Sequence, residues 1–255
     1  APVTALRDAP RPDAARLTEA LRGETVRVFD RDAEGWAWGQ LAADGYVGWL
    51  ALDDLDAQAP APTHRVAAVR TLLFAGPDIK SAPLAGLPLG AAVALRGESE
   101  DRNARYGLVA PAGAIVMQHL RPLGAAWETD FVAVAERFLG VPYLWGGKTS
   151  LGLDCSGLVQ VALAAAGVAA PRDTDMQAAE TGLPLPLAPD PTPLRRGDLV
   201  FWRGHVGIMQ DGERLLHANA HHMAVASEPL REAAARLAAK GSAVIALRRP
   251  AAGAQ

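Results

Sequence analysis

The 255-residue chain contains a single cysteine, Cys155, which excludes an internal disulfide. Its net charge is only −3, which argues against nucleic acid as a partner. It also lacks an apolar stretch long enough to span a membrane. Half of the residues are nevertheless hydrophobic. These properties predict a globular protein without a membrane span or a nucleic-acid partner.

The sequence begins without Met and without the apolar core of a signal peptide. A lone thiol fits a reducing compartment but does not prove one. We therefore expect a cytoplasmic location and keep a periplasmic or secreted one open, in case a leader was removed. The sequence does not indicate an oligomeric state.

The N-terminal half is typical of small all-β domains. Residues 1–15 are rich in Ala, Pro and charge, and we interpret them as an arm. Short strand-like runs separated by Gly and Asp follow at 24–30, 35–42 and 45–55, and residues 56–63 are typical of a linker.

The next stretch partly repeats the first. Trp38-Gly39 and Gly45 recur as Tyr106-Gly107 and Gly113, 68 residues further on. Such a repeat predicts two copies of a small β domain, one in residues 1–60 and one in 61–124.

Residues 125–255 change to an α+β pattern. Trp127, Phe131, Val134 and Phe138 form one helical stripe, with Glu128 or Thr129 near its start. A buried helix is predicted from Cys155 to Gly167, and the five prolines of 183–193 predict a loop. Strands are expected at 197–202, 205–210, 214–220 and 242–250, with a surface helix at 228–240.

Cys155 at the start of a helix would lie over unpaired backbone N–H groups. That position lowers the pKa of a thiol and favours a thiolate nucleophile, which also needs an oriented base. Residues 205–219 read as a hairpin. A three-residue loop with Gly212 left-handed places His205 directly opposite His217, whereas a two-residue turn places them on opposite faces; we predict the first. His205 would then accept the thiol proton and His217 would fix its tautomer.

Less specific interpretations compete with this one. A lone cysteine before an apolar helix is more often inert core, and a strand histidine is more often structural. Cysteine and histidines together also suggest zinc, but one cysteine forms no C-x-x-C pair, so we predict no metal and no cofactor. The β repeats alone would suit a non-catalytic binding module.

The segments "DCSGLVQ", "GDLVFW", "GHVGIM" and "LLHAN" together resemble the NlpC/p60 family of papain-like cell-wall cysteine peptidases. The resemblance covers about residues 125–250. It implies a cysteine-bearing helix packed on an antiparallel sheet, with Cys155 as nucleophile, His205 as base and His217 as the third polar residue. The β repeats resemble the bacterial SH3-like domains that accompany this catalytic domain.

Two further motifs, "PYLWGG" and "PRDTDMQ", resemble the γ-D-glutamyl-L-diamino-acid endopeptidases that act on muropeptides. The resemblance implies that Tyr143 and Trp145 line the cleft and that Asp173 holds the free amine of an N-terminal L-Ala. The remaining pocket positions would be Asp154, Ser156 and Thr174. The alternative for Asp173 is an N-cap of the helix that follows it.

The expected protein thus has an α+β cysteine endopeptidase domain in residues 125–255, preceded in the sequence by two SH3-like barrels. It would hydrolyse the γ-D-Glu–diamino acid bond of peptidoglycan stem peptides with a free L-Ala terminus, in murein recycling or turnover. The alternatives are a non-catalytic wall-binding protein and a thiol acyltransferase or amidase on the same scaffold. The sequence does not distinguish which diamino acid occupies the third position.

Overall fold

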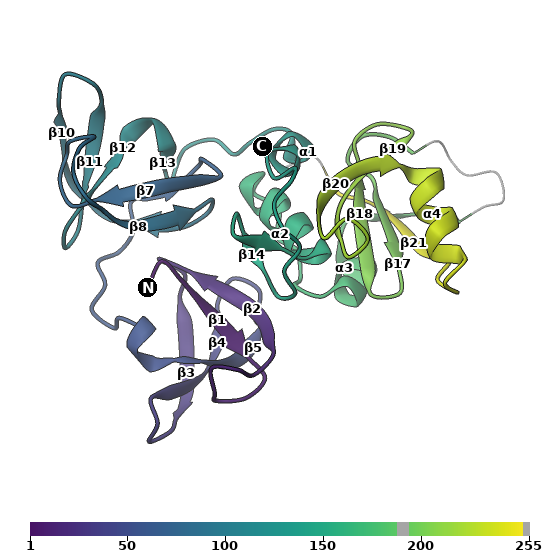
Figure 1. The fold of residues 1–255 in the computed structure, drawn as a ribbon, viewed down its shortest axis with the longest axis horizontal. Coiled ribbons are helices and arrows are strands. Elements are labelled where there is room, and N and C mark those ends of the chain that lie inside the picture. The colour runs from purple at the N-terminus through teal and green to yellow at the C-terminus, as the bar shows by residue number, and fades with distance from the viewer. Residues whose placement is uncertain (188–193, 252–255) are drawn as a thin grey trace. The chain divides into compact units, whose positions relative to one another are not determined.

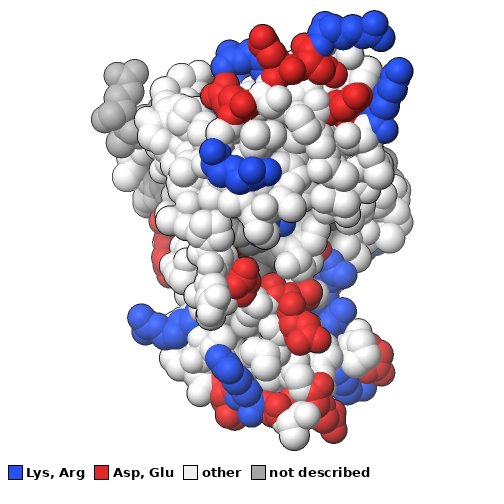
Figure 2. Space-filling model, turned by 90° about the vertical axis from the view of Figure 1, so that its left-hand side faces the viewer, with Lys and Arg blue, Asp and Glu red and all other residues white. Residues whose placement is uncertain are grey.

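The structure is a computed structural model, and it describes residues 1–187 and 194–251 (Figure 1). The chain divides into two compact units, Ala1–Ala126 and Trp127–Gln255, and each is described by itself below. Among the described residues, no helix is both long and apolar enough to cross a membrane. On the face shown in Figure 2, basic and acidic side chains are interspersed and much of the surface carries neither.

The first part of unit 1 is a sheet with strand order β2-β1-β5-β4-β3. The expected strands are confirmed, but residues 1–15 are not an arm. β1 lies between β2 and β5, and Leu6 is fully buried in the core. Five residues are too few for side-chain alternation to reveal this strand, and one of its two partners, β5, is distant in sequence. The elements are β1 Val3–Arg7, β2 Arg16–Leu21, β3 Val26–Arg31, β4 Trp36–Leu41, β5 Val47–Ala51 and the 3₁₀ turn Leu52–Asp54.

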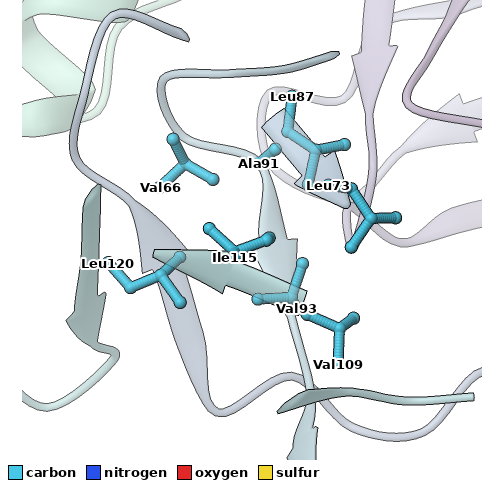
Figure 3. Close-up of a cluster of buried hydrophobic side chains, with 8 residues drawn as sticks. All are labelled: Val66, Leu73, Leu87, Ala91, Val93, Val109, Ile115 and Leu120. Carbon is cyan, nitrogen blue, oxygen red and sulfur yellow. The ribbon is translucent and has the colours of Figure 1, made fainter. Parts of the chain in front are cut away.

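The second part of unit 1 contains the sheet β10-β11-β12-β7-β8 and the small sheet β13-β6-β9. Aliphatic side chains from both sheets, among them Val66, Leu87 and Ile115, form its core (Figure 3). The elements are β6 His64–Val66, β7 Arg70–Phe74, β8 Pro83–Pro88, β9 Ala92–Val93, β10 Leu95–Glu100, β11 Arg105–Val109, β12 Ala114–Val116, the 3₁₀ turn Met117–His119 and β13 Leu120–Pro122.

The sequence repeat corresponds to a structural one. In both parts of unit 1, two adjacent antiparallel strands are followed by a 3₁₀ turn. Gly45 and Gly113 lie between the two strands in each copy, and both have positive φ, at 74° and 105°. Glycine recurs there because other residues rarely adopt that backbone conformation.

In the described part of unit 2, six strands form a sheet of order β16-β21-β17-β18-β19-β20. Leu183–Leu185 was expected to be loop but forms β16 at the sheet edge, where Pro184 is tolerated because an edge strand needs fewer N–H donors. The rest of that expected loop, 188–193, lies outside the described residues. The strands are β16 Leu183–Leu185, β17 Leu199–Trp202, β18 His205–Met209, β19 Arg214–Asn219, β20 Ala224–Pro229 and β21 Val244–Arg249, with a separate hairpin of β14 Lys148–Thr149 and β15 Gly152–Leu153.

Four helices in the described residues complete unit 2: α1 Phe131–Glu136, α2 Cys155–Ala165, α3 Thr174–Glu180 and α4 Leu230–Ala238. α1 starts later than expected, because Asp130, not Glu128 or Thr129, accepts hydrogen bonds from the N–H groups of Val132 and Ala133. α2 packs against β18 and β19, which brings the cysteine's helix against the strands that carry both histidines (Figure 1). The predicted α+β class is confirmed.

Candidate active site

Cys155 is the first residue of α2, as the sequence predicted. Asp154 is the N-cap, and its Oδ1 accepts a hydrogen bond from the N–H of Gly157 at 2.7 Å. The helix therefore begins at one defined residue, because the cap satisfies a backbone N–H that would otherwise lack a partner. This cap fixes where the thiol leaves the backbone.

A buried arginine holds that cap, and the sequence analysis missed it. Arg172 donates to both carboxylate oxygens of Asp154, at 2.9 and 2.6 Å, and to Ser156 Oγ at 2.8 Å. Its side chain is only 1% exposed. Asp154 also accepts from the N–H of Gly146 at 2.8 Å, so both of its oxygens are engaged by protein groups. The structure thus shows Asp154 and Ser156 as parts of the support of Cys155; their predicted contact with substrate stays a prediction.

The segment "PYLWGG" packs against the start of α2. A Cβ added at Gly157 would lie 2.2 Å from the carbonyl oxygen of Gly147, so only glycine permits this approach. Tyr143 is half-buried, and burial together with the charges of Cys155 and Asp154 raises its pKa to about 12. Trp145 is 67% exposed. The charge of Cys155 thus acts on Tyr143, whereas Trp145 offers an open aromatic surface on the same segment.

The thiol of Cys155 is buried, at 7% exposure. Burial, followed by the negative charge of Asp154, raises the pKa of Cys155 to about 11. The backbone N–H groups of Val206 and Ser156 act in the opposite direction, but they do not compensate. The expected thiolate is therefore wrong for the free chain, because the loss of solvation outweighs the helix terminus.

The two histidines share one face of the sheet, but not in the predicted register. Ile208 pairs with Leu216, which places His205 two residues away from the position opposite His217. Because strand side chains alternate with a period of two, the shift by two leaves both on the same face. His205 Nε2 lies 2.8 Å from His217 Nδ1.

The register differs because the hairpin closes in another way. Gln210 pairs with Arg214 across a three-residue loop, and Asp211 Oδ1 accepts from the N–H groups of Glu213 and Arg214 at 2.7 and 2.8 Å. Gly212 is not among the glycines with positive φ. An aspartate-capped turn thus replaces the left-handed glycine that the sequence suggested.

Behind His217 lies a second pair that the sequence analysis missed. His217 Nε2 lies 2.8 Å from Glu228 Oε1, and Arg236 donates to both oxygens of Glu228 at 2.5 and 2.8 Å. Glu228 was expected in a surface helix, but it belongs to β20 and is 7% exposed. The alternation of β20 places it beside His217.

The electrostatics of the histidine pair keep both rings neutral. Burial, with the nearby His217 and Arg236, lowers the pKa of His205 to about 3, and burial also lowers the pKa of His217. The hydrogen bonds from Arg236 lower the pKa of Glu228 to about 2, so this carboxylate stays charged. A neutral imidazole is the form that accepts a proton.

The motif "PRDTDMQ" also fixes the geometry around Cys155. Gln177 is fully buried and donates to the carbonyl oxygens of Ser156 and Pro171, at 3.0 and 2.8 Å. Asp173 occupies the N-cap position of α3, but its side chain does not cap the helix. Thr174 is the first residue of α3. The capping alternative for Asp173 is therefore wrong, and its contact with substrate stays a prediction.

Three potential metal-ligand groups, on His217, His222 and Glu228, lie within 4.8 Å of one another. The guanidinium of Arg236 already binds both oxygens of that carboxylate. A second cation there would meet the repulsion of Arg236, so the arrangement suits a hydrogen-bonded chain better than a metal.

A thiol at a helix start, an imidazole that can accept its proton and a second group that orients the imidazole are the parts of cysteine-dependent acyl transfer. Comparison with known proteins agrees. Residues 140–238 match the NlpC/P60 family, and residues 6–55 match the bacterial dipeptidyl-peptidase SH3 domain. Residues 140–238, which include Cys155, are thus an NlpC/P60 domain, and the SH3 domain precedes them in the sequence.

Individual relatives are similar over different lengths. The gamma-D-glutamyl-L-lysine dipeptidyl-peptidase of Bacillus subtilis is 38% identical over 98 residues, which cover 35% of this chain and 31% of that protein. The protein of the same name from Bacillus cereus is 27% identical over 237 residues, 82% of this chain and 63% of the relative. This chain thus spans less than two thirds of these relatives. A crystal structure of an NlpC/P60 family protein from Bacillus cereus shares the fold, with a TM-score of 0.76 at 20% identity over 97% of this chain and 96% of that one.

Proposed function

We propose that the chain is a cysteine peptidase that hydrolyses the γ-D-Glu–diamino acid bond of peptidoglycan stem peptides with a free N-terminal L-Ala. The observation that carries the proposal is the hydrogen-bonded pair His205–His217 on strands packed against the helix that Cys155 begins. The names of the relatives, which are gamma-D-glutamyl dipeptidyl-peptidases, support the substrate class.

The reaction would begin from a neutral thiol and a neutral imidazole. His205 Nδ1 accepts the thiol proton as the sulfur of Cys155 attacks the γ-carbonyl carbon of D-Glu. Backbone N–H groups at the start of α2, including that of Cys155, would stabilise the oxyanion. The protonated His205 then gives its proton to the leaving amine, and a thioester remains on Cys155.

Water completes the cycle. Neutral His205 removes a proton from water, whose oxygen attacks the thioester and releases L-Ala-γ-D-Glu, and the proton returns to the sulfur. The raised pKa of Cys155 and the lowered pKa of His205 support a general-base mechanism. The ion pair would form only during attack, when the proton moves.

Asp173 would select the substrate terminus. Asp173 is half-buried and directly follows Arg172, which donates a hydrogen bond to Asp154, the N-cap residue next to Cys155, and this neighbourhood supports the role. A carboxylate that pairs with the ammonium group of L-Ala favours a free terminus, because an acylated terminus is uncharged and cannot form this ion pair. Selection of a free terminus suits released stem peptides and hence murein recycling or turnover.

Turnover of L-Ala-γ-D-Glu-meso-diaminopimelate by single variants tests these roles. Cys155→Ala should abolish release of diaminopimelate, and His205→Ala should reduce kcat more than His217→Ala does. Full activity of Cys155→Ala would refute the proposal. An acyl product on an added amine instead of free L-Ala-γ-D-Glu would indicate a transferase.

The role of Asp173 needs the ratio of two substrates. Asp173→Asn should lower kcat/KM for the free tripeptide and leave the N-acetylated one unchanged, which reduces selectivity at least about tenfold. Asp175→Asn, an exposed aspartate two residues further on, serves as the matched control. Unchanged selectivity in Asp173→Asn would remove Asp173 from the pocket.

A further inference from the structure

The series of hydrogen bonds that begins at His205, the hydrogen-bonded chain, does not end at His217. From β18 to α4 it runs His205–His217–Glu228–Arg236, with both histidine contacts at 2.8 Å. Two of its members, His217 and Glu228, are buried, at 1% and 7% exposure. A buried chain of this kind has one consistent arrangement of protons, and it can be deduced from the far end.

The deduction starts at Arg236, which can only donate. Its two hydrogen bonds to Glu228 require oxygen acceptors, so Glu228 is a carboxylate that accepts at both oxygens. His217 Nε2 must therefore carry a proton to donate to Glu228 Oε1.

In a neutral imidazole only one nitrogen carries a proton, so His217 Nδ1 is an acceptor. His205 Nε2 faces that acceptor and must carry the proton of the hydrogen bond between the rings. His205 Nδ1 is then left with its lone pair, which is the form that a general base for Cys155 requires.

We propose that Glu228, held by Arg236, is a positioning residue that sets the tautomers of both histidines and so keeps His205 Nδ1 unprotonated toward Cys155. The proposal rests on the proposed function for its role in catalysis, but the tautomers themselves do not depend on any substrate. A neighbour that could also donate would permit the reverse arrangement, in which His205 Nδ1 is protonated and cannot act as a base.

Arg236 explains how a carboxylate can orient His217 without charging it. A lone carboxylate beside an imidazole raises the pKa of that imidazole, whereas the guanidinium lowers it. Both directions are present at His217, and burial dominates them, so its pKa is lowered. Three other ionisable groups lie near these four residues. Glu232 acts on Arg236 through its charge, His222 Nδ1 lies 3.9 Å from Glu228 Oε1, and Cys155 is on α2, which packs against β18.

The first test is the ¹⁵N chemical shifts of the histidine ring nitrogens in the substrate-free protein near pH 7. His205→Gln and His217→Gln assign the two signals. We expect both rings to be neutral with the proton on Nε2. A proton on Nδ1 of either ring, or a charged His217, would overturn the proposal without the need for any Glu228 variant.

The second test is Glu228→Gln, whose amide has the same shape and can donate as well as accept. We expect a second set of ring shifts for both histidines and a fall in kcat of about a hundredfold with KM nearly unchanged, because the effect lies in the protonation of the base. Glu213→Gln, an exposed glutamate in the loop between β18 and β19, is the matched control and should match the wild type. An unchanged kcat in a folded Glu228→Gln protein would overturn the proposal.

A third readout separates this inference from the peptidase proposal. Alkylation of Cys155 by iodoacetamide near pH 7 needs the base but no peptide. We expect Glu228→Gln to slow it at least about tenfold relative to Glu213→Gln, because a His205 that is protonated on Nδ1 cannot accept the thiol proton. If Glu228→Gln slows alkylation but the wild-type protein does not cleave the peptide, only the proposed function is refuted. Equal alkylation rates would refute the role of Glu228.

Discussion

Two arginine–carboxylate pairs support the reacting groups, one behind the nucleophile and one behind the base. Arg172 and Asp154 are nearly inaccessible, with side-chain exposures of 1% and 9%. Arg236 is more open, at 23%, although its partner Glu228 is equally buried at 9%. The carboxylate of Asp154 accepts hydrogen bonds from its arginine and from backbone N–H groups, whereas that of Glu228 also accepts one from His217.

The difference shows that one chemical motif serves two purposes. The Asp154–Arg172 pair holds a helix start in place, and its contribution is structural. The Glu228–Arg236 pair directs a proton donor on an imidazole, and its contribution is to protonation. Removal of each arginine should therefore disturb the protein in a different way.

The largest effect on stability is expected on the nucleophile side. Arg172→Met would leave Asp154 buried without its cation and should lower the free energy of unfolding of unit 2 by about 3–5 kcal/mol. Because Cys155 is the only cysteine and lies in unit 2, its labelling by a thiol reagent in increasing urea reports the unfolding of this unit alone. Arg137→Met, which breaks an exposed pair with Glu128, should cost less than about 1 kcal/mol. An equal loss of unfolding free energy in Arg172→Met and Arg137→Met would contradict the expected difference between buried and exposed ion pairs.

Acid is expected to destabilise the protein through His205 and His217. His205 and His217 have lowered pKa values in the folded chain, so the unfolded chain binds more protons below its histidine pKa near 6.5. The free energy of unfolding is therefore not reduced by the two histidines above that pH. As the pH falls below it, each histidine lowers this free energy by up to about 1.4 kcal/mol per pH unit. Glu228, with a pKa of about 2, adds a loss in the same direction below about pH 4.5. Urea unfolding at several pH values between 7.5 and 5 measures how steeply the free energy of unfolding falls with pH. His217→Gln should show a smaller fall than wild type, and an equal fall would contradict the neutral buried ring of His217.

Between the two arginines of the site, the smaller effect on stability is expected from Arg236→Gln. Because this guanidinium is partly exposed, its loss should cost only about 1–2 kcal/mol of unfolding free energy, less than Arg172→Met. The carboxylate that remains should raise the pKa of His217, and the acid limb of kcat/KM should move to higher pH. Wild type should keep its activity well below pH 6.5, since the pKa of His205 is about 3. An identical pH profile in both proteins would show that Arg236 does not act on the histidines.

The sequence was sufficient where the pattern is local. The helix start at Cys155 follows from an apolar run behind an N-cap residue, and strand alternation puts His205 and His217 on one face even in the shifted register. The alternation has a period of two, so an error of two residues does not change the face.

Long-range partners were not predictable in the same way. Arg172 meets Asp154 across 18 residues, and β1 pairs on one side with β5, through Arg7 and Trp49. Glu228 was assigned to a helix because it directly precedes a helical pattern, although it ends a strand. The raised pKa of Cys155 was missed because helix position is visible in a sequence and burial of one thiol is not.

The most direct test of the account is the mass-spectrometric analysis of two peptides incubated with the full chain. One is L-Ala-γ-D-Glu-meso-diaminopimelate with a free N-terminus, and the other is the same peptide with its N-terminus acetylated. The account predicts release of diaminopimelate from the free peptide only, and no release with Cys155→Ala. Release from both peptides would contradict selection by Asp173. Release from neither peptide, nor from the analogues with lysine in the third position, would contradict the peptidase and favour a wall-binding role.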